Sequence, residues 1–132
     1  MNLVVDTSVI IAVLTSEPER ARLVELTSGV NLITPASVHW EVGNALAAMF
    51  KRGRIDGKQV KQVLRAYERI PIQYLDVALG DALELALEHG LYAYDAYVLA
   101  CAMSHRCRLI SLDKGLVRAA GAAGIGVLEV GE

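Results

Sequence analysis

The chain has 132 residues, a formal net charge of −2 at pH 7, and a hydrophobic content of 54%. This length suits one domain over residues 1–132 and leaves no room for a second core. The apolar composition excludes a disordered chain, and the slightly acidic balance excludes a general electrostatic attraction to nucleic acid or to anionic membranes.

The predicted strands are short and apolar, and they cover residues 3–5, 31–34, 71–75, 108–112 and 127–130. The predicted helices alternate with them and cover about 7–14, 16–28, 35–52, 58–69, 76–89, 96–104 and 114–120. Ser16 is the expected hydroxyl cap of the second helix, because Pro18 and Glu19 suit its first turn. This alternation predicts an α/β fold whose mostly parallel sheet of about five strands has helices on both faces.

The sequence predicts a cytoplasmic location without membrane contact. Cys101 and Cys107 lack the paired spacing of a zinc site, and two cysteines without a secretory signal suit a reducing compartment. The first residues contain no basic segment and reach an acid at Asp6, unlike a signal peptide. No apolar stretch has the ~18–20 uncharged residues of a membrane span.

Acidic residues recur where the predicted strands and helices meet. Asp6 and Asp113 directly follow apolar strands, and Glu41 and Asp95 lie near the start of predicted helices. Because the carboxyl ends of parallel strands share one edge, all four can meet in one pocket. Each acid also has an ordinary structural explanation. For Asp6 and Asp95 this is the capping or charge stabilisation of a helix start, and for Asp113 it is a turn.

A cluster of four carboxylates in one pocket predicts a binding site for a cation. Two carboxylates ~4 Å apart repel by ~4 kcal/mol at an effective dielectric constant of ~20, so the group must bind protons or metal. Carboxylate oxygens, together with the hydroxyls of Thr7 or Ser8, suit Mg²⁺ or Mn²⁺. A divalent ion held in this way polarises a phosphodiester and activates the attacking water.

Four segments resemble the PIN-domain family, and most closely the VapC-type toxins of toxin–antitoxin pairs. They are Val4-Val5-Asp6-Thr7-Ser8, Glu41 with Asn44 after Thr34-Pro35, Tyr94-Asp95-Ala96, and Leu109-Ile110-Ser111-Leu112-Asp113. They span nearly the whole chain in the order and at the spacings of that family.

The resemblance implies a three-layer PIN fold and a metal-dependent endoribonuclease that hydrolyses RNA with a metal-activated water. It implies that Asp6, Glu41, Asp95 and Asp113 are the catalytic and metal-binding acids, with Mg²⁺ or Mn²⁺ as cofactor. Thr7, Ser8, Asn44 and Ser111 are then supporting residues. The implied partners are an RNA substrate, an inhibitory antitoxin protein and a second copy of the chain.

RNA contacts have two candidate sources. Arg54, Lys58, Lys61 and Arg65 lie in a basic stretch, and the last three recur at helical spacing, as either an ordinary solvated face or a phosphate-contacting flank. The aromatic residues of interest are Trp40, Tyr92, Tyr94 and Tyr97. They could stack on bases, but we expect most of them to pack in the core or an interface.

Four alternatives remain open from the residues. A phosphatase of the haloacid-dehalogenase type would use Asp6 as a nucleophile, but Ser8 stands where that class has a second acid. A receiver domain would need paired acids near the first strand. The chain could also be a catalytically idle PIN-like module that binds RNA or protein, or a housekeeping PIN nuclease outside a toxin–antitoxin pair.

Overall fold

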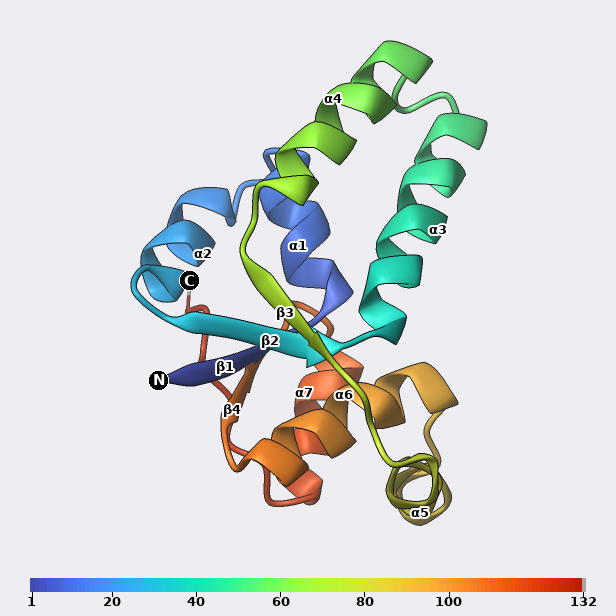
Figure 1. Ribbon diagram of the computed structural model, residues 1–132. Helices are drawn as coiled ribbons and strands as arrows, with labels where there is room; N and C mark the ends of the chain where they lie inside the picture. Colours follow the sequence, from blue (N-terminus) through green and yellow to red (C-terminus); the bar gives the residue numbers. More distant parts are fainter. Residues whose placement is uncertain (132) are drawn as a thin grey trace.

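Over residues 1–131, which a computed structural model describes, four parallel strands form one sheet between two layers of helices (Figure 1). The strands are β1 (Asn2–Val5), β2 (Asn31–Pro35), β3 (Ile72–Leu75) and β4 (Arg108–Ile110), in the order β3-β2-β1-β4. The helices are α1 (Thr7–Leu14), α2 (Arg20–Thr27), α3 (Ser37–Lys51), α4 (Gly57–Glu68), α5 (Leu79–His89), α6 (Ala93–His105) and α7 (Lys114–Ala122). Figure 1 shows α1 to α4 on one face of the sheet and α5 to α7 on the other. Glu132, the last residue of the expected domain, lies outside the described residues.

The first strand is the centre of the core. Leu3, Val4 and Val5 are at most 2% exposed, and β1 pairs in parallel with β2 on one side and with β4 on the other. Because successive side chains of a strand point to opposite faces, three buried residues in a row require cover on both faces. The chain therefore leaves β1 at the middle of the carboxyl-terminal edge of the sheet.

The expected strand over 127–130 is the main difference in the sheet. Within the described residues it is reduced to one parallel bridge between Leu109 and Val127, held by the Leu109 amide donating to Gly126 (3.0 Å) and the Leu128 amide donating to Leu109 (2.8 Å). The neighbouring strand β4 ends at Ile110 and offers only a short edge. The parallel character of the sheet is as predicted.

The second and fifth helices begin later than the sequence indicates. Ser16 does not cap α2, since its φ of 55° is left-handed, whereas a capping residue is extended. The Glu17 amide instead donates to the Ala12 carbonyl at 2.9 Å, so Ser16 belongs to the end of α1 and α2 starts at Arg20. Likewise, α5 starts at Leu79, three residues after the predicted start.

Helices α3 and α4 form an antiparallel arm that extends away from the sheet (Figure 1). Asp56 caps the start of α4 through reciprocal hydrogen bonds with Gln59. Near the sheet, His39 Nδ1 on α3 lies 2.9 Å from the hydroxyl of Tyr67 on α4. The arm is thus tied together at its base, beside the sheet edge from which α3 starts.

Helix α6 is the most deeply packed helix of the lower layer in Figure 1, with Ala96, Val98 and Leu99 buried. It starts at Ala93, three residues before the predicted start, and Asp95 lies in its first turn. In the described part of the chain, no helix combines the length and apolar character needed to cross a membrane.

Arg106 ends α6 in a left-handed conformation, with φ 50° and ψ 46°. A Cβ in this conformation costs roughly 1 kcal/mol, so we expect Arg106→Gly to raise the free energy of unfolding by about 0.5–1 kcal/mol. Urea denaturation followed by circular dichroism measures the change. Arg106→Ala is the matched control, since it removes the same side chain and keeps the Cβ. An equal gain in both variants would assign the effect to the lost charge.

Candidate active site

Asp6 directly follows β1 and lies at the centre of the carboxyl-terminal edge of the sheet, where it is only 6% exposed. Two hydroxyls donate to its carboxylate: Ser8 Oγ to Oδ1 at 2.6 Å, and Ser111 Oγ to Oδ2 at 2.7 Å. It also caps α1, where the Val9 amide lies 3.4 Å from Oδ1. The structural and functional interpretations of Asp6 are therefore compatible.

The same two serines position the turn that carries Asp113. Ser8 Oγ accepts the Leu112 amide at 2.9 Å, and Ser111 Oγ accepts the Asp113 amide at 3.0 Å. Each hydroxyl therefore donates to Asp6 and accepts from the turn after β4. This arrangement follows from the register, because Val5 lies opposite Ile110 and the next residues of both strands meet.

Asp113 caps α7 through a single oxygen. Its Oδ1 accepts the amides of Gly115 (2.9 Å) and Leu116 (3.1 Å), so Oδ2 is not used by the cap. A Cβ on Gly115 would lie 3.3 Å from Oδ1, which makes glycine the easiest residue to fit there. The Asp113 side chain is exposed beside the buried Asp6.

Glu41 on α3 and Asp95 on α6 complete the acidic cluster. Burial raises the pKa of the Glu41 carboxyl to about 7, with further increases from the charges of Asp6 and Asp95 and a partial offset from the Thr7 hydroxyl. Burial and the charge of Asp113 also raise the pKa of Asp95. The structure thus brings the four predicted acids within electrostatic reach of one another.

Burial likewise raises the pKa of Asp6, and the nearby charge of Asp113 adds to this increase. The hydrogen bonds from Ser8 and Ser111 act in the opposite direction. Among residues 1–131, no Lys, Arg or His forms an ion pair with any of the four carboxylates. Their mutual repulsion is therefore uncompensated by protein cations.

A cavity of about 260 Å³ opens on the Glu41 side of this cluster, lined by Thr7, Trp40, Glu41, Asn44 and Tyr94, whereas Asp6, Asp95 and Asp113 do not line it. Thr7 Oγ1 and Glu41 Oε2 are buried at this point, and neither forms a hydrogen bond of normal geometry, although the Thr7 hydroxyl lies close enough to Glu41 to lower its pKa. A buried polar atom without a partner costs roughly 1–3 kcal/mol, so both oxygens favour a ligand that they can bind. The predicted supporting residues Thr7, Ser8, Asn44 and Ser111 all lie at this site.

The donor set fits a hard divalent cation in its chemistry, since it consists of carboxylate and hydroxyl oxygens. In the described residues, no group of three or more His, Cys, Asp or Glu side chains is close enough to hold a metal ion as it stands. Mg²⁺ usually takes one or two carboxylates and keeps several waters, so it does not require such a closed group. The residues present therefore fit a hydrated Mg²⁺ or Mn²⁺.

The predicted RNA-contacting residues lie elsewhere. Arg54 lies in the turn of the arm, and Lys58, Lys61 and Arg65 lie on α4, all exposed. Within the described chain they form no ion pair, and none of them lines the cavity beside the acids. They form a basic flank that is separate from the acidic pocket.

Most of the aromatic residues do not pack in the core, which contradicts one part of the expectation that they pack in the core or an interface. Trp40, Tyr92 and Tyr94 are 73%, 88% and 58% exposed, and only Tyr97 is partly buried. Trp40 and Tyr94 line the cavity, a position that suits the base stacking considered for them from the sequence. The sequence indicates this location, because Trp40 directly precedes Glu41 and Tyr94 directly precedes Asp95. Residues next to each other at the start of a helix lie at the same edge of the sheet.

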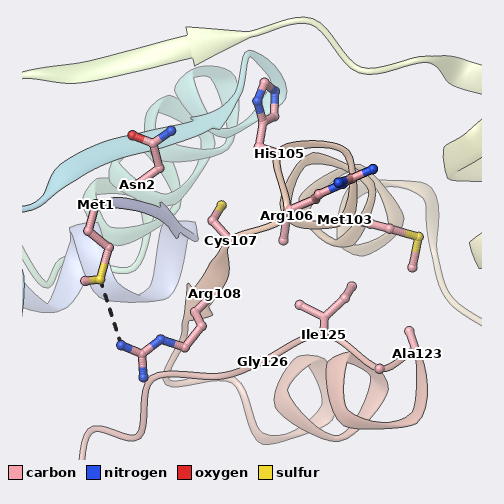
Figure 2. A pocket seen from close by; sticks show the side chains of 12 residues that line it. Met1, Asn2, Met103, His105, Arg106, Cys107, Arg108, Ala123, Ile125 and Gly126 are labelled. Atoms are coloured by element: carbon pink, nitrogen blue, oxygen red, sulfur yellow. Dashed lines mark hydrogen bonds between the residues drawn. The ribbon is translucent and has the colours of Figure 1, made fainter.

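A larger cavity, of about 700 Å³, lies at the opposite, amino-terminal edge of the sheet (Figure 2). Its lining contains His105, Arg106 and Arg108 but no acidic residue. Figure 2 shows the Arg108 guanidinium donating a hydrogen bond to the Met1 sulfur. The side chain of Arg106, at the end of α6, lies apart from this pair. His105 and Arg106 lie at the negative end of the α6 dipole, where basic side chains are ordinarily stabilising. Their presence in this cavity therefore has a structural explanation and does not by itself indicate a functional site.

Ser8 links Asp6 to the turn after β4, so we expect Ser8→Ala to lower the free energy of unfolding by about 1–3 kcal/mol. The variant leaves the Leu112 amide without its acceptor and removes one donor from Asp6. Chemical denaturation measures the loss. Ser104→Ala, at an exposed position of α6, is the matched control and should change stability by less than about 0.5 kcal/mol.

We expect the metal-free protein to lose stability between pH 5 and pH 8. The pKa of Glu41 is about 7 in the folded protein against 4.5 ordinarily, so the folded state holds a proton that the unfolded chain has released. Raising the pH through this window therefore favours unfolding. Glu41→Gln should stabilise the protein at pH 8 by about 1–2 kcal/mol, allowing for partial solvent screening, and by less at pH 5.

Thermal unfolding in EDTA at both pH values measures this difference. Glu84→Gln, on the exposed face of α5, is the control and should leave the pH dependence unchanged. Parallel pH profiles for wild type and Glu41→Gln would contradict the electrostatic coupling described above.

Comparison with known proteins identifies the family. A model of the PIN domain matches residues 3–122. The chain is 31% identical over 122 residues to Ribonuclease VapC3 of Pyrobaculum aerophilum, covering 88% of this chain and 92% of that protein.

Two solved structures share the fold. PAE2754 from Pyrobaculum aerophilum superposes with a TM-score of 0.68 at 23% identity, covering 96% of this chain and 83% of that one. A toxin–antitoxin complex from Klebsiella pneumoniae contains a chain that superposes with a TM-score of 0.66 at 20% identity, with 98% of both chains covered. With the family model spanning most of the sequence, this chain belongs to the PIN domain family.

Proposed function

We propose that this protein is a metal-dependent endoribonuclease and the toxin component of a type II toxin–antitoxin pair. The observation that carries the proposal is the group of four acids at one sheet edge, without compensating protein cations. The similarity to a protein named Ribonuclease VapC3 supports RNA as the substrate. Membership of the PIN family disfavours the phosphatase and receiver alternatives.

Asp6, Asp95 and Asp113 are the proposed ligands of Mg²⁺ or Mn²⁺, with Glu41 contributing directly or through water. A divalent ion bound there would neutralise the scissile phosphate and lower the pKa of the attacking water. Both oxygens of Asp6 already accept hydroxyl hydrogen bonds, which hold the carboxylate in one orientation. Such a fixed carboxylate suits a ligand better than a covalent nucleophile.

The remaining residues position water and substrate. Glu41 Oε2 is buried without a partner and can accept a hydrogen bond from the attacking water. Thr7 Oγ1 is a second unpartnered oxygen beside it. Asn44, exposed on the next turn of α3, can donate to a phosphate oxygen or to a ribose hydroxyl. Together these groups orient an in-line attack on the phosphodiester.

The proposed partners are an antitoxin and a second copy of the chain. A free ribonuclease would damage its own cell, so an inhibitor is expected, and one structural relative was solved as a toxin–antitoxin complex. The exposed apolar residues of α3 and α4, Phe50 and Leu64, support a protein interface on the arm. Analytical ultracentrifugation of the chain alone tests the proposed homodimer.

We expect Asp6→Asn to reduce RNA cleavage at least about 100-fold, because the variant removes the central ligand charge and about 3 kcal/mol of transition-state stabilisation. The measurement is cleavage of a labelled RNA in Mn²⁺ or Mg²⁺. EDTA should abolish wild-type cleavage, and added Mn²⁺ should restore it.

Asp81→Asn is the matched control, since Asp81 lies in the first turn of α5 away from the site and should leave cleavage unchanged. Far-UV circular dichroism establishes that both variants fold. Full metal-dependent cleavage by Asp6→Asn would refute the assignment, and the absence of cleavage by the wild type with either metal would favour the idle-module alternative.

A further inference from the structure

The cavity beside the acids has two aromatic side chains in its wall. Trp40 and Tyr94 line it together with Thr7, Glu41 and Asn44, and the two rings are 73% and 58% exposed. Large aromatic surfaces left in water beside a polar cavity are typical of sites that stack a planar ligand. Neither ring is required by the core, from which both project.

Each ring is held in place by an edge-to-face contact with one neighbour. Trp40 meets His39 with ring centroids 4.8 Å apart and planes at 75°, and Tyr94 meets Tyr97 at 5.9 Å and 86°. Such contacts favour one orientation of a ring by about 0.5–1.5 kcal/mol. Each ring thus has one packing partner while most of its surface stays open to solvent.

The two rings come from different elements but occupy equivalent positions relative to the acids. Trp40 directly precedes Glu41 near the start of α3, and Tyr94 directly precedes Asp95 at the start of α6. A phosphodiester held at the carboxylates therefore has an aromatic side chain beside it on both helices. The groups that flank a phosphodiester in RNA are nucleosides.

On the basis of the proposed ribonuclease function, we propose that Trp40 and Tyr94 stack an unpaired base next to the scissile phosphate. Such a stack requires an unpaired base, as a single strand or a loop of folded RNA offers. In a duplex the bases are stacked on one another and cannot offer their faces to protein side chains.

The charge distribution favours base contacts at this point over backbone contacts. The four carboxylates repel phosphate groups, and the exposed cations of the arm do not line the cavity. A base has an uncharged face that an aromatic ring can bind beside acids, and each such stack contributes roughly 1–3 kcal/mol. Stacking thus supplies attraction that the carboxylates by themselves cannot.

Trp40 is the only tryptophan in the sequence, so its fluorescence reports directly on this site. The Asp6→Asn chain, which should not cleave, is titrated with a short unstructured RNA, with the same RNA annealed to its complement, and with inorganic tripolyphosphate. We expect quenching by the single strand alone. The wild-type chain in EDTA provides the same measurement if Asp6→Asn fails to fold.

Tyr94 variants test the second ring with the same fluorescence signal. Tyr94→Leu should weaken binding of the single strand about 10-fold, whereas Tyr94→Phe should stay within about twofold because it keeps the ring. Tyr92→Leu is the matched control, since Tyr92 is an exposed tyrosine of the same segment that does not line the cavity. It should also stay within about twofold.

Equal quenching by duplex or tripolyphosphate would overturn the proposal, as would no quenching by an RNA that the wild type cleaves. Trp40 fluorescence that changes with protein concentration but not on addition of RNA would also overturn the proposal. It would indicate that the exposed aromatic rings contact a second copy of the chain. Quenching by the single strand without cleavage by the metal-loaded wild type would instead reject the ribonuclease function and retain the base-binding site.

Discussion

The burial of the Asp6 carboxylate under two serine hydroxyls is the interaction on which the rest of the site depends. Removing a charge from water is unfavourable, and the hydroxyls of Ser8 and Ser111 replace part of the lost hydration. These hydroxyls accept the Leu112 and Asp113 amides at the same time. The solvation of the first acid therefore determines the path of the chain after β4, and through it the place of the fourth acid.

The arrangement of the four acids leaves their negative charges without compensating positive charges from the protein over residues 1–131. Glu41 and Asp95 arrive on α3 and α6 at the same edge, and each of the four acids lies within electrostatic reach of another. A cluster with no protein cation in the described residues is most stable when it holds protons or a metal ion. The fold thus supplies rigid oxygen donors, and the ligand that would stabilise them comes from solution.

The sequence predicted the parts of this structure that depend on local pattern. The apolar run of β1 indicated a buried parallel strand, and the acids after the strands and at the helix starts were expected to be able to meet at its carboxyl-terminal edge. The left-handed Ser16, the reduced strand near Val127 and the exposed Trp40 were not predicted. Each depends on which neighbour is present in three dimensions, and the spacing of residue types along the chain carries little of that information.

The separation of acids, cations and aromatic rings has a physical reason. A lysine or arginine inside the pocket would pair with the carboxylates and compete with a metal for their oxygens. The basic side chains lie on the arm instead, where they can attract a polyanion over a distance set by the salt concentration. Close to the acids, attraction has to come from a bound cation or from groups without charge, and the exposed faces of Trp40 and Tyr94 are groups of the second kind. An acidic pocket can therefore bind a negatively charged polymer if long-range attraction and short-range contact come from different side chains.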